Sequence, residues 1–200
     1  MTQKKDAPKR KRTQQERLAE TRAKLLDAAF ELFSKHGYAE TGTPEIVRKA
    51  GVTRGALYHQ FDSKRDLFHA LAIRESEAVA ASIVASTEGL DDPDRALLVG
   101  TEAYFDAMSV PGRARLLLAE APGVLGYFIT RELTHLQGGE ALHEGLQYAL
   151  PELDPELLSA LANAVSAAFD RSALAIAEGQ SRDSYSEAMR LLVKLLTKSN

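Results

Sequence analysis

The strongest constraint on the fold is a run of 24 residues, Thr43 to Asp66, with the sequence pattern of two short helices joined by a tight turn. Thr43 is a good helix N-cap, and Pro44 behind it suits the first helical position, where a missing N–H does no harm. Gly51 ends the first helix because glycine readily adopts the left-handed conformation. Thr53 caps the second. Helices this short need a platform to pack on, because helix nucleation is unfavourable.

Both short helices have an apolar face, and the second also has a polar one. The apolar positions recur at helical spacing, at Ile46, Val47 and Ala50 and then at Leu57 and Phe61. The outward face of the second helix carries side chains that can reach phosphates or base edges: Arg54, Tyr58, His59 and Gln60. A helix-turn-helix needs such a face on its recognition helix.

A longer stretch, Phe33 to Leu71, carries further anchors in a fixed order. They are the Gly37-Tyr38 helix end, the Ala50-Gly51-Val52 turn, Leu57-Tyr58, and Phe61-x-Ser63-Lys64-x-x-Leu67. This stretch resembles the TetR-like family of bacterial transcriptional regulators. The resemblance implies a homodimeric repressor that binds an inverted-repeat operator in double-stranded DNA and is released by a small-molecule effector. The sequence departs from the family at Pro44, where a polar or basic residue often stands.

The motif and the resemblance together predict the DNA contacts. Arg54 is the one recognition-helix residue that can donate bidentately to guanine, Gly55 allows close approach, and Ala56 can touch a thymine methyl. The match to the family motif implies phosphate contacts from Tyr58 and Lys64. The full predicted DNA-binding set is Thr43, Thr53, Arg54, Gly55, Ala56, Tyr58, His59 and Lys64.

The net charge of −3 is unevenly distributed, with +6 on residues 1–75 and −9 on residues 76–200. Such asymmetry suggests that the basic part meets a polyanion. The alternative is a merely soluble tail, since residues 1–12 alone supply +5. The segment Pro8 to Arg12 would then either follow a phosphate backbone or minor groove, or form a solvated leader.

Several classes of protein are disfavoured by the composition. The absence of cysteine removes disulfides, thiol redox chemistry and cysteine zinc sites. No run of eighteen apolar residues occurs and no apolar region follows the basic N-terminus, so we expect no membrane span, no secretory signal and a cytoplasmic location. The five histidines form no metal-binding pair, and no phosphate loop or nucleophile elbow is present. We therefore expect no metal, no cofactor and no enzymatic activity.

The periodicity of apolar residues predicts an all-α fold without strands or repeats. We expect a disordered basic arm over 1–13, a helix-turn-helix DNA-binding domain over 14–75, and a helical regulatory and dimerisation domain over 76–200. The expected helices beyond the two short ones are about Gln14–His36, Lys64–Ser86, Asp92 to Met108, a short one bracketed by Pro111-Gly112 and Pro122-Gly123, Gly123–Leu136, Glu140–Leu150, Glu156–Glu178 and Arg182–Lys198. Gly138-Gly139 is expected to be a hinge or stop.

The last two helices combine small residues with wide apolar faces, which favours a four-helix bundle with a symmetry mate. The alternative is an ordinary buried pair within a monomer. The predicted dimer interface is Leu158, Leu161, Val165, Phe169, Tyr185, Met189, Leu192 and Leu196.

Aromatic residues gather in the region that is interrupted by Pro-Gly and Gly-Gly pairs. They predict a pocket for an apolar or aromatic effector, lined by Tyr104, Phe105, Met108, Tyr127, Phe128, His135 and Tyr148. For any one of these residues, simple core filling is the alternative. A different class of function also stays open, namely a helical adaptor that binds protein without binding DNA.

Overall fold

The computed structural model describes residues 13–197, apart from the side chain of Gln137. All regular structure in this range is helical, which confirms the predicted all-α class. The predicted basic arm lies outside the described residues except for Thr13, which caps the first helix through its side chain. Among residues 13–197, no helix combines the length and the apolar composition needed to cross a membrane.

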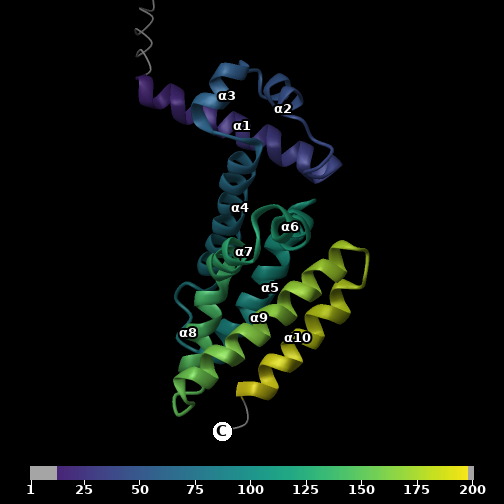
Figure 1. The fold of residues 1–200 in the computed structure, drawn as a ribbon. Helices are drawn as coiled ribbons and strands as arrows, with labels where there is room; N and C mark the ends of the chain where they lie inside the picture. Colours follow the sequence, from purple (N-terminus) through teal and green to yellow (C-terminus); the bar gives the residue numbers. More distant parts are fainter. Residues whose placement is uncertain (1–12, 198–200) are drawn as a thin grey trace, which may run out of the picture.

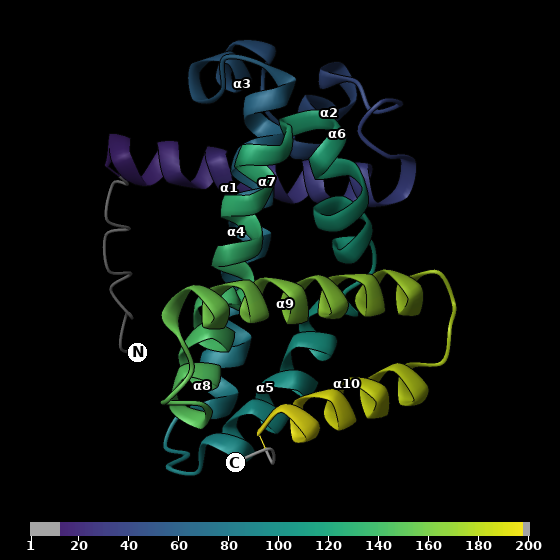
Figure 2. The same cartoon turned by 60° about the horizontal axis from the view of Figure 1, so that its bottom comes forward.

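The helices are α1 (Gln14–His36), α2 (Thr43–Ala50), α3 (Arg54–Gln60), α4 (Lys64–Thr87), α5 (Pro93–Met108), the π-helical turn η1 (Arg115–Glu120), α6 (Ala121–Leu125), α7 (Tyr127–Thr134), the π-helical turn η2 (His135–Gly139), α8 (Glu140–Ala149), α9 (Pro155–Ala177) and α10 (Arg182–Thr197). α1, α2 and α3 form a head, and α4 runs from the head into a larger body built from α5 to α10 (Figure 1). α9 and α10 lie side by side on the outside of the body (Figures 1 and 2).

The start of α2 differs from the prediction. Gly42 is the N-cap, with extended backbone angles, and no side chain caps the helix. Thr43 is already helical, so Pro44 occupies the second position, where its missing N–H is still one of the unpaired groups of the first turn. The other boundaries of the motif are confirmed. Gly51 is left-handed at φ 65°, and the Thr53 hydroxyl accepts from the Ala56 N–H at 3.1 Å.

The helices after α5 also depart from the prediction. The expected stop at Pro122-Gly123 is wrong, because η1 passes directly into α6 and the chain turns only at Gly126. Pro122 is tolerated because it lies in the first turn of α6 and follows a wide π-helical turn, closed by the Ala121 N–H to Leu116 carbonyl bond. The predicted hinge at Gly138-Gly139 is confirmed as a kink at Gly138.

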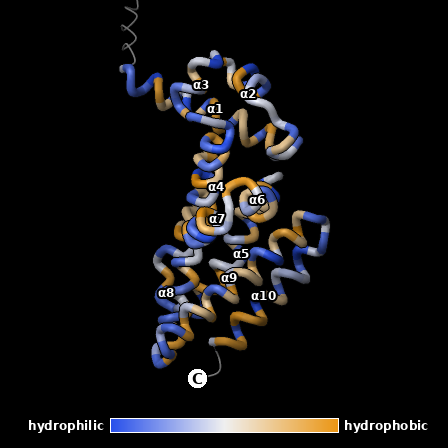
Figure 3. The backbone as a smooth tube through the Cα atoms, viewed as in Figure 1, coloured by the Kyte–Doolittle hydropathy of each residue, from blue (hydrophilic) through white to orange (hydrophobic). Residues whose placement is uncertain are grey.

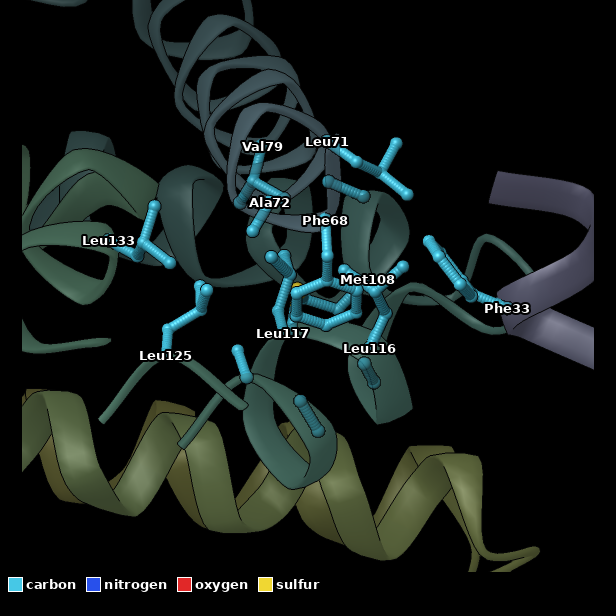
Figure 4. Packing of buried hydrophobic residues seen from close by; sticks show 14 of the residues in the cluster. Phe33, Phe68, Leu71, Ala72, Val79, Met108, Leu116, Leu117, Leu125 and Leu133 are labelled. Atoms are coloured by element: carbon cyan, nitrogen blue, oxygen red, sulfur yellow. The ribbon is translucent and has the colours of Figure 1, made fainter. Parts of the chain in front are cut away.

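One hydrophobic core runs from the head into the body. In the head the core is centred on three rings whose centroids lie 5.0 to 5.6 Å apart. They belong to Phe33 of α1, to Tyr38 of the loop between α1 and α2, and to Phe68 of α4. Figure 4 shows Phe68 beside Met108 and Leu116 of the body. Along the tube of Figure 3, hydrophobic and hydrophilic residues alternate in most helices, as expected for amphipathic helices that each cover one side of a core.

A buried ion-pair network ties the head to the body. Glu75 of α4 is only 4% exposed, and its Oε2 accepts from Arg113 Nε at 2.9 Å and Nη2 at 2.8 Å. Its Oε1 accepts from Arg74, whose Nη1 reaches Asp27 of α1 at 2.7 Å. Arg113 also donates to the Ala107 carbonyl at 2.6 Å. One carboxylate therefore connects α1, α4 and the end of α5.

This network predicts a large cost for neutralising Glu75. In Glu75→Gln, two guanidinium groups face an uncharged amide in a buried site, so we expect the free energy of unfolding to fall by about 3–5 kcal/mol in urea titrations. Asp27→Asn is the matched control, because the Asp27 side chain is 69% exposed and its loss should cost at most about 1 kcal/mol. Equal losses in the two variants would contradict the assigned role of Glu75.

Candidate nucleic-acid interface and ligand cavity

The recognition helix α3 turns one side to the core and the other to solvent. Leu57 is completely buried, whereas Thr53, Arg54, Gly55, Tyr58 and His59 are exposed. Ala56 is half-buried, and its N–H is already used by the Thr53 cap. The structure therefore places most of the predicted DNA-binding residues on one exposed surface.

Thr43, Arg54 and Tyr58 meet on this surface although they come from two helices. The Arg54 guanidinium carbon lies 5.5 Å from the centroid of the Tyr58 ring. Hydrogen bonding to Thr43, and then to Arg54, lowers the pKa of the exposed Tyr58 phenol below its ordinary value. The start of α2 and the recognition helix thus present one continuous polar surface, which we call the Arg54 surface.

Gln60 was predicted to face outward, and this prediction is wrong. Its side-chain amide donates to the Leu18 carbonyl of α1 at 3.2 Å. As the last residue of α3, Gln60 faces the platform helix, where its amide fixes the end of the recognition helix. Nearby, the Arg22 guanidinium carbon of α1 lies 4.6 Å from the centroid of the Phe61 ring, a second contact between α1 and the end of α3.

Lys64 has structural partners that the motif did not indicate. Its Nζ donates to the carbonyls of Tyr38 at 2.8 Å and Thr41 at 3.0 Å, and it lies 4.1 Å from the Tyr38 ring centroid. An ammonium group has three donors, so one remains for a phosphate. The phosphate contact stays a prediction, and the observed role of Lys64 is to hold the loop between α1 and α2.

A cavity of about 320 Å³ lies in the body between α4, α5, η2, α8, α9 and α10. Its walls are largely aliphatic and aromatic, with a few polar groups: Ile83, Val84, Thr87, Pro93, Ala96, Leu97, Gly100, Thr101, Tyr104, Thr134, Gly138, Gly139, Ala141, Leu142, Glu144, Gly145, Ser166, Phe169, Asp170 and Val193. This composition is typical of small-molecule sites. The backbone approaches a neighbouring helix closely at Gly138, where an added Cβ would lie 2.6 Å from the Ile83 side chain. At Gly100 an added Cβ would make ordinary contacts at 3.7 Å.

Of the seven residues predicted for the effector site, only Tyr104 lines this cavity. Phe105 and Met108 are buried in the core and border a second hollow near Ser34. The remaining four lie on the surface: Tyr127 (71% exposed), Phe128 (80%), Tyr148 (70%) and His135. The turn at Gly126 and the kink at Gly138 set the direction of these helices, and sequence periodicity could not predict which face each would expose.

Asp170 is a cavity residue that the sequence reasoning missed. The Tyr104 hydroxyl donates to Asp170 Oδ1 at 2.7 Å. Burial raises the pKa of Asp170, against the opposing effect of this hydrogen bond, and burial followed by the nearby carboxylate raises the pKa of Tyr104 well above its ordinary value. The available signal was a charged residue directly after Phe169, inside the predicted apolar stripe of α9.

The predicted dimer interface is only partly available. Leu158, Val165, Phe169 and Met189 are buried inside their own chain, so they cannot form a seam with another. The other four predicted residues are half-buried: Leu161, Tyr185, Leu192 and Leu196. The large apolar side chains that α9 and α10 do expose are Leu157 (56%), Leu191 (55%) and Leu195 (61%).

Polar contacts connect the head directly to α6 and η1. Arg65, at the start of α4, donates to the carbonyls of Val124 at 3.1 Å and Leu125 at 2.9 Å, at the end of α6. Glu120 of η1 accepts from the Tyr38 N–H at 2.7 Å and pairs with Arg115 at 3.0 Å. α6 and η1 thus contact the segments on both sides of the helix-turn-helix.

These features define a helix-turn-helix DNA-binding protein with a helical body that contains a cavity. Residues 25–71 match the family model described as bacterial regulatory proteins, tetR family. Residues 95–199 match a second model, the tetracyclin repressor-like C-terminal domain. The chain belongs to the TetR family of bacterial transcriptional regulators.

Individual relatives agree with this membership. An HTH-type transcriptional repressor of Mycobacterium tuberculosis is 36% identical over 90 residues, which are 45% of this chain and 47% of the relative. The repressor AcnR of Corynebacterium glutamicum is 39% identical over 90 residues, 45% of this chain and 46% of the relative. The chain spans about half the length, or less, of the curated relatives it matches.

Solved structures match over nearly the whole chain. A TetR-family transcriptional regulator from Pectobacterium atrosepticum is 27% identical, covers 92% of this chain and 95% of its own, and gives a TM-score of 0.70. A regulator from Syntrophomonas wolfei, at 16% identity, covers 90% and 95% with a TM-score of 0.76 and supports the fold alone. Within residues 13–197, no three His, Cys, Asp or Glu side chains are grouped to hold a metal ion.

The contacts of Lys64 predict an effect that is independent of DNA. Lys64→Met leaves the carbonyls of Tyr38 and Thr41 without their charged donor, so we expect the free energy of unfolding to fall by about 1–3 kcal/mol in urea. Lys24→Met, at an exposed i,i+4 pair with Glu20, should cost less than about 0.5 kcal/mol. If Lys64→Met left stability unchanged but weakened binding to every DNA sequence alike, Lys64 would serve mainly as a phosphate contact.

Proposed function

We propose that this chain is a homodimeric transcriptional repressor that binds an inverted-repeat operator and is released by a small molecule. The observation that carries the proposal is the Arg54 surface, where an arginine is exposed on a recognition helix that Leu57 and Gln60 fix to the head. Two of the relatives are named repressors and one, from Mycolicibacterium smegmatis, is named an activator, so repression is the favoured direction.

Base recognition falls to Arg54 in this proposal. Its guanidinium can donate two hydrogen bonds to guanine in the major groove, while Gly55 beside it offers no side chain to block the approach. Tyr58 lies near the Arg54 guanidinium and next to Thr43, and in this proposal it limits the rotamers of the arginine and donates to a phosphate. This division gives sequence preference to Arg54 and register to Tyr58.

The dimer seam is proposed to lie on the exposed stripes of the last two helices. On α9 the stripe comprises Leu157, Ala160, Ala164 and Ala167, and on α10 it comprises Ala188, Leu191 and Leu195. Small residues let helices approach closely, so these stripes can pair with their copies in a four-helix bundle. Two-fold pairing would then have to place the recognition helices about 34–36 Å apart, one turn of DNA, or a multiple of that.

Release is proposed to act through α4. The body end of this helix lines the cavity through Ile83, Val84 and Thr87, and its head end carries Arg65, which is bound to α6. A ligand can lower DNA affinity only if it binds better to a conformation in which the recognition helices miss the operator spacing. Coupling of about 1–3 kcal/mol is typical of such switches, and DNA must weaken ligand binding by the same factor.

The DNA-binding proposal is tested first by selecting bound sites from random DNA and measuring affinity by mobility shift over a range of salt. We expect an inverted repeat. We expect Arg54→Ala to lose about 1–3 kcal/mol per base contact and to reduce the ratio of specific to nonspecific affinity. Arg95→Ala, an equal charge change at an exposed position of α5, should bind like the wild type. An unchanged ratio in Arg54→Ala would refute the assignment, and no binding at any sequence would favour the adaptor alternative.

The dimer proposal predicts that Leu191→Glu places a charge in the seam. We expect monomers by light scattering and a loss of operator binding, with the Arg54 surface intact. Phe128→Glu, at another exposed apolar residue, should remain dimeric. Leu192→Asp is a poorer test, because Leu192 packs against the core of its own chain and its loss would disturb folding. Monomers from Phe128→Glu alone would move the seam to α7.

A further inference from the structure

The charged groups of the cavity all have one sign. Its lining includes two carboxylates, Asp170 of α9 and Glu144 of α8, and among the described residues that line it none is lysine, arginine or histidine. The rest of the wall is aliphatic, aromatic or neutral and polar. A cavity of this kind repels an anionic ligand and attracts a cationic one.

Asp170 is half-buried and is the more enclosed of the two carboxylates, since Glu144 is exposed. Its one hydrogen-bond partner within residues 13–197 is the Tyr104 hydroxyl, which donates to Oδ1 at 2.7 Å. No salt bridge to Asp170 forms within the same range, and no positive charge offsets the effect of burial on its pKa. A carboxylate with little access to water is stabilised by a cation or by several donors. Oδ2 is therefore available to a partner that the chain itself does not supply.

The Tyr104–Asp170 hydrogen bond joins α5 to α9, but this structural role does not require a charged residue at position 170. The Tyr104 hydroxyl needs one acceptor, which an asparagine at position 170 would offer without the desolvation cost of a carboxylate. At the junction of head and body, by contrast, the buried carboxylate of Glu75 is paired with two arginines. By comparison, Asp170 lacks its counter-charge, and it faces an open cavity.

The aromatic wall next to Asp170 suits a cation as well. The rings of Tyr104 and Phe169 both line the cavity, with centroids 5.5 Å apart in an edge-to-face arrangement. Aromatic faces attract ammonium groups, and most strongly where water is excluded. Beyond them, Leu97 and Leu142 offer aliphatic surface for a hydrocarbon tail.

We propose that the cavity binds a lipophilic cation, with its ammonium group at Asp170 Oδ2 beside the Tyr104 and Phe169 rings and its hydrocarbon part along Leu97 and Leu142. This inference names the ligand class of the effector site, so its regulatory meaning rests on the proposed function. Binding itself requires neither DNA nor release.

The first test compares three ligands of one length, decylamine, decanol and decanoate, by calorimetry on the full chain without DNA and below their micelle concentrations. The amine is cationic at neutral pH, the alcohol is neutral and the carboxylate is anionic. We expect decylamine to bind about tenfold to a hundredfold more tightly than decanol, and decanoate to bind most weakly. No binding of decylamine, or binding of decanol or decanoate at equal strength, would overturn the proposal.

The second test removes the charge at constant shape. Asp170→Asn keeps an acceptor for Tyr104, and we expect it to lower decylamine affinity about tenfold to a hundredfold while decanol affinity stays the same. Glu140→Gln, on α8 but outside the cavity lining, should bind decylamine like the wild type. Tyr104→Phe keeps the carboxylate and should keep the preference for the amine. Full amine affinity in Asp170→Asn would overturn the proposal, and if that variant fails to fold, the wild-type comparison of ligands decides.

Adding decylamine to the protein–operator complex separates this inference from the proposed function. Binding to the free protein without release of operator would support the ligand class and refute the release mechanism. Amine binding by a chain that binds no operator would refute only the DNA-binding function. A chain that binds operator but prefers decanoate or decanol would keep its proposed function and refute the ligand class.

Discussion

The arrangement of the head on the body depends on the buried carboxylate of Glu75. Taking this charge out of water is unfavourable, and only the two arginines that meet it, Arg74 and Arg113, make the burial tolerable. Arg74 is the neighbour of Glu75 on α4, but Arg113 comes from the segment after α5, so the pairing with Arg113 forms only when α4 is correctly docked on the body. It thus selects one relative placement of recognition helix and cavity, beyond what apolar contacts alone would require.

α4 links the head to the cavity in the body. One helix carries Phe68 in the head core, Glu75 at the junction and Ile83 in the cavity wall, all on buried positions of a single rigid element. The hydrophobic core is continuous along α4, so the buried residues of the head and of the body form one cluster (Figure 4). α4 thus joins the cavity end of the body to the head, and the contacts of Arg65 with α6 form a second connection.

Local chemistry explains which parts of the structure could be predicted from the sequence. The caps at Thr53, Ser63 and Asp92 each rest on a side chain and an N–H two or three residues away, so the sequence contains all that is needed. Contacts between distant segments are different. The links of Lys64 to Tyr38 and of Tyr104 to Asp170 span 26 and 66 residues, and no periodicity reveals them. The same holds for Tyr127, whose exposure depends on how α7 sits against its neighbours.

The position of Gly100 in the cavity wall has a consequence for engineering. A methyl group there would meet Ile83 and Thr87 at ordinary contact distance, unlike one at Gly138 or Gly145, where it would collide. An alanine at position 100 would therefore reduce the cavity without a collision, and α4, about 36 Å long at 1.5 Å per residue, runs from this region to the head that carries the Arg54 surface. Under the proposed function, ligand size and operator preference are set in separate parts of the chain, so a designed biosensor could change one while keeping the other.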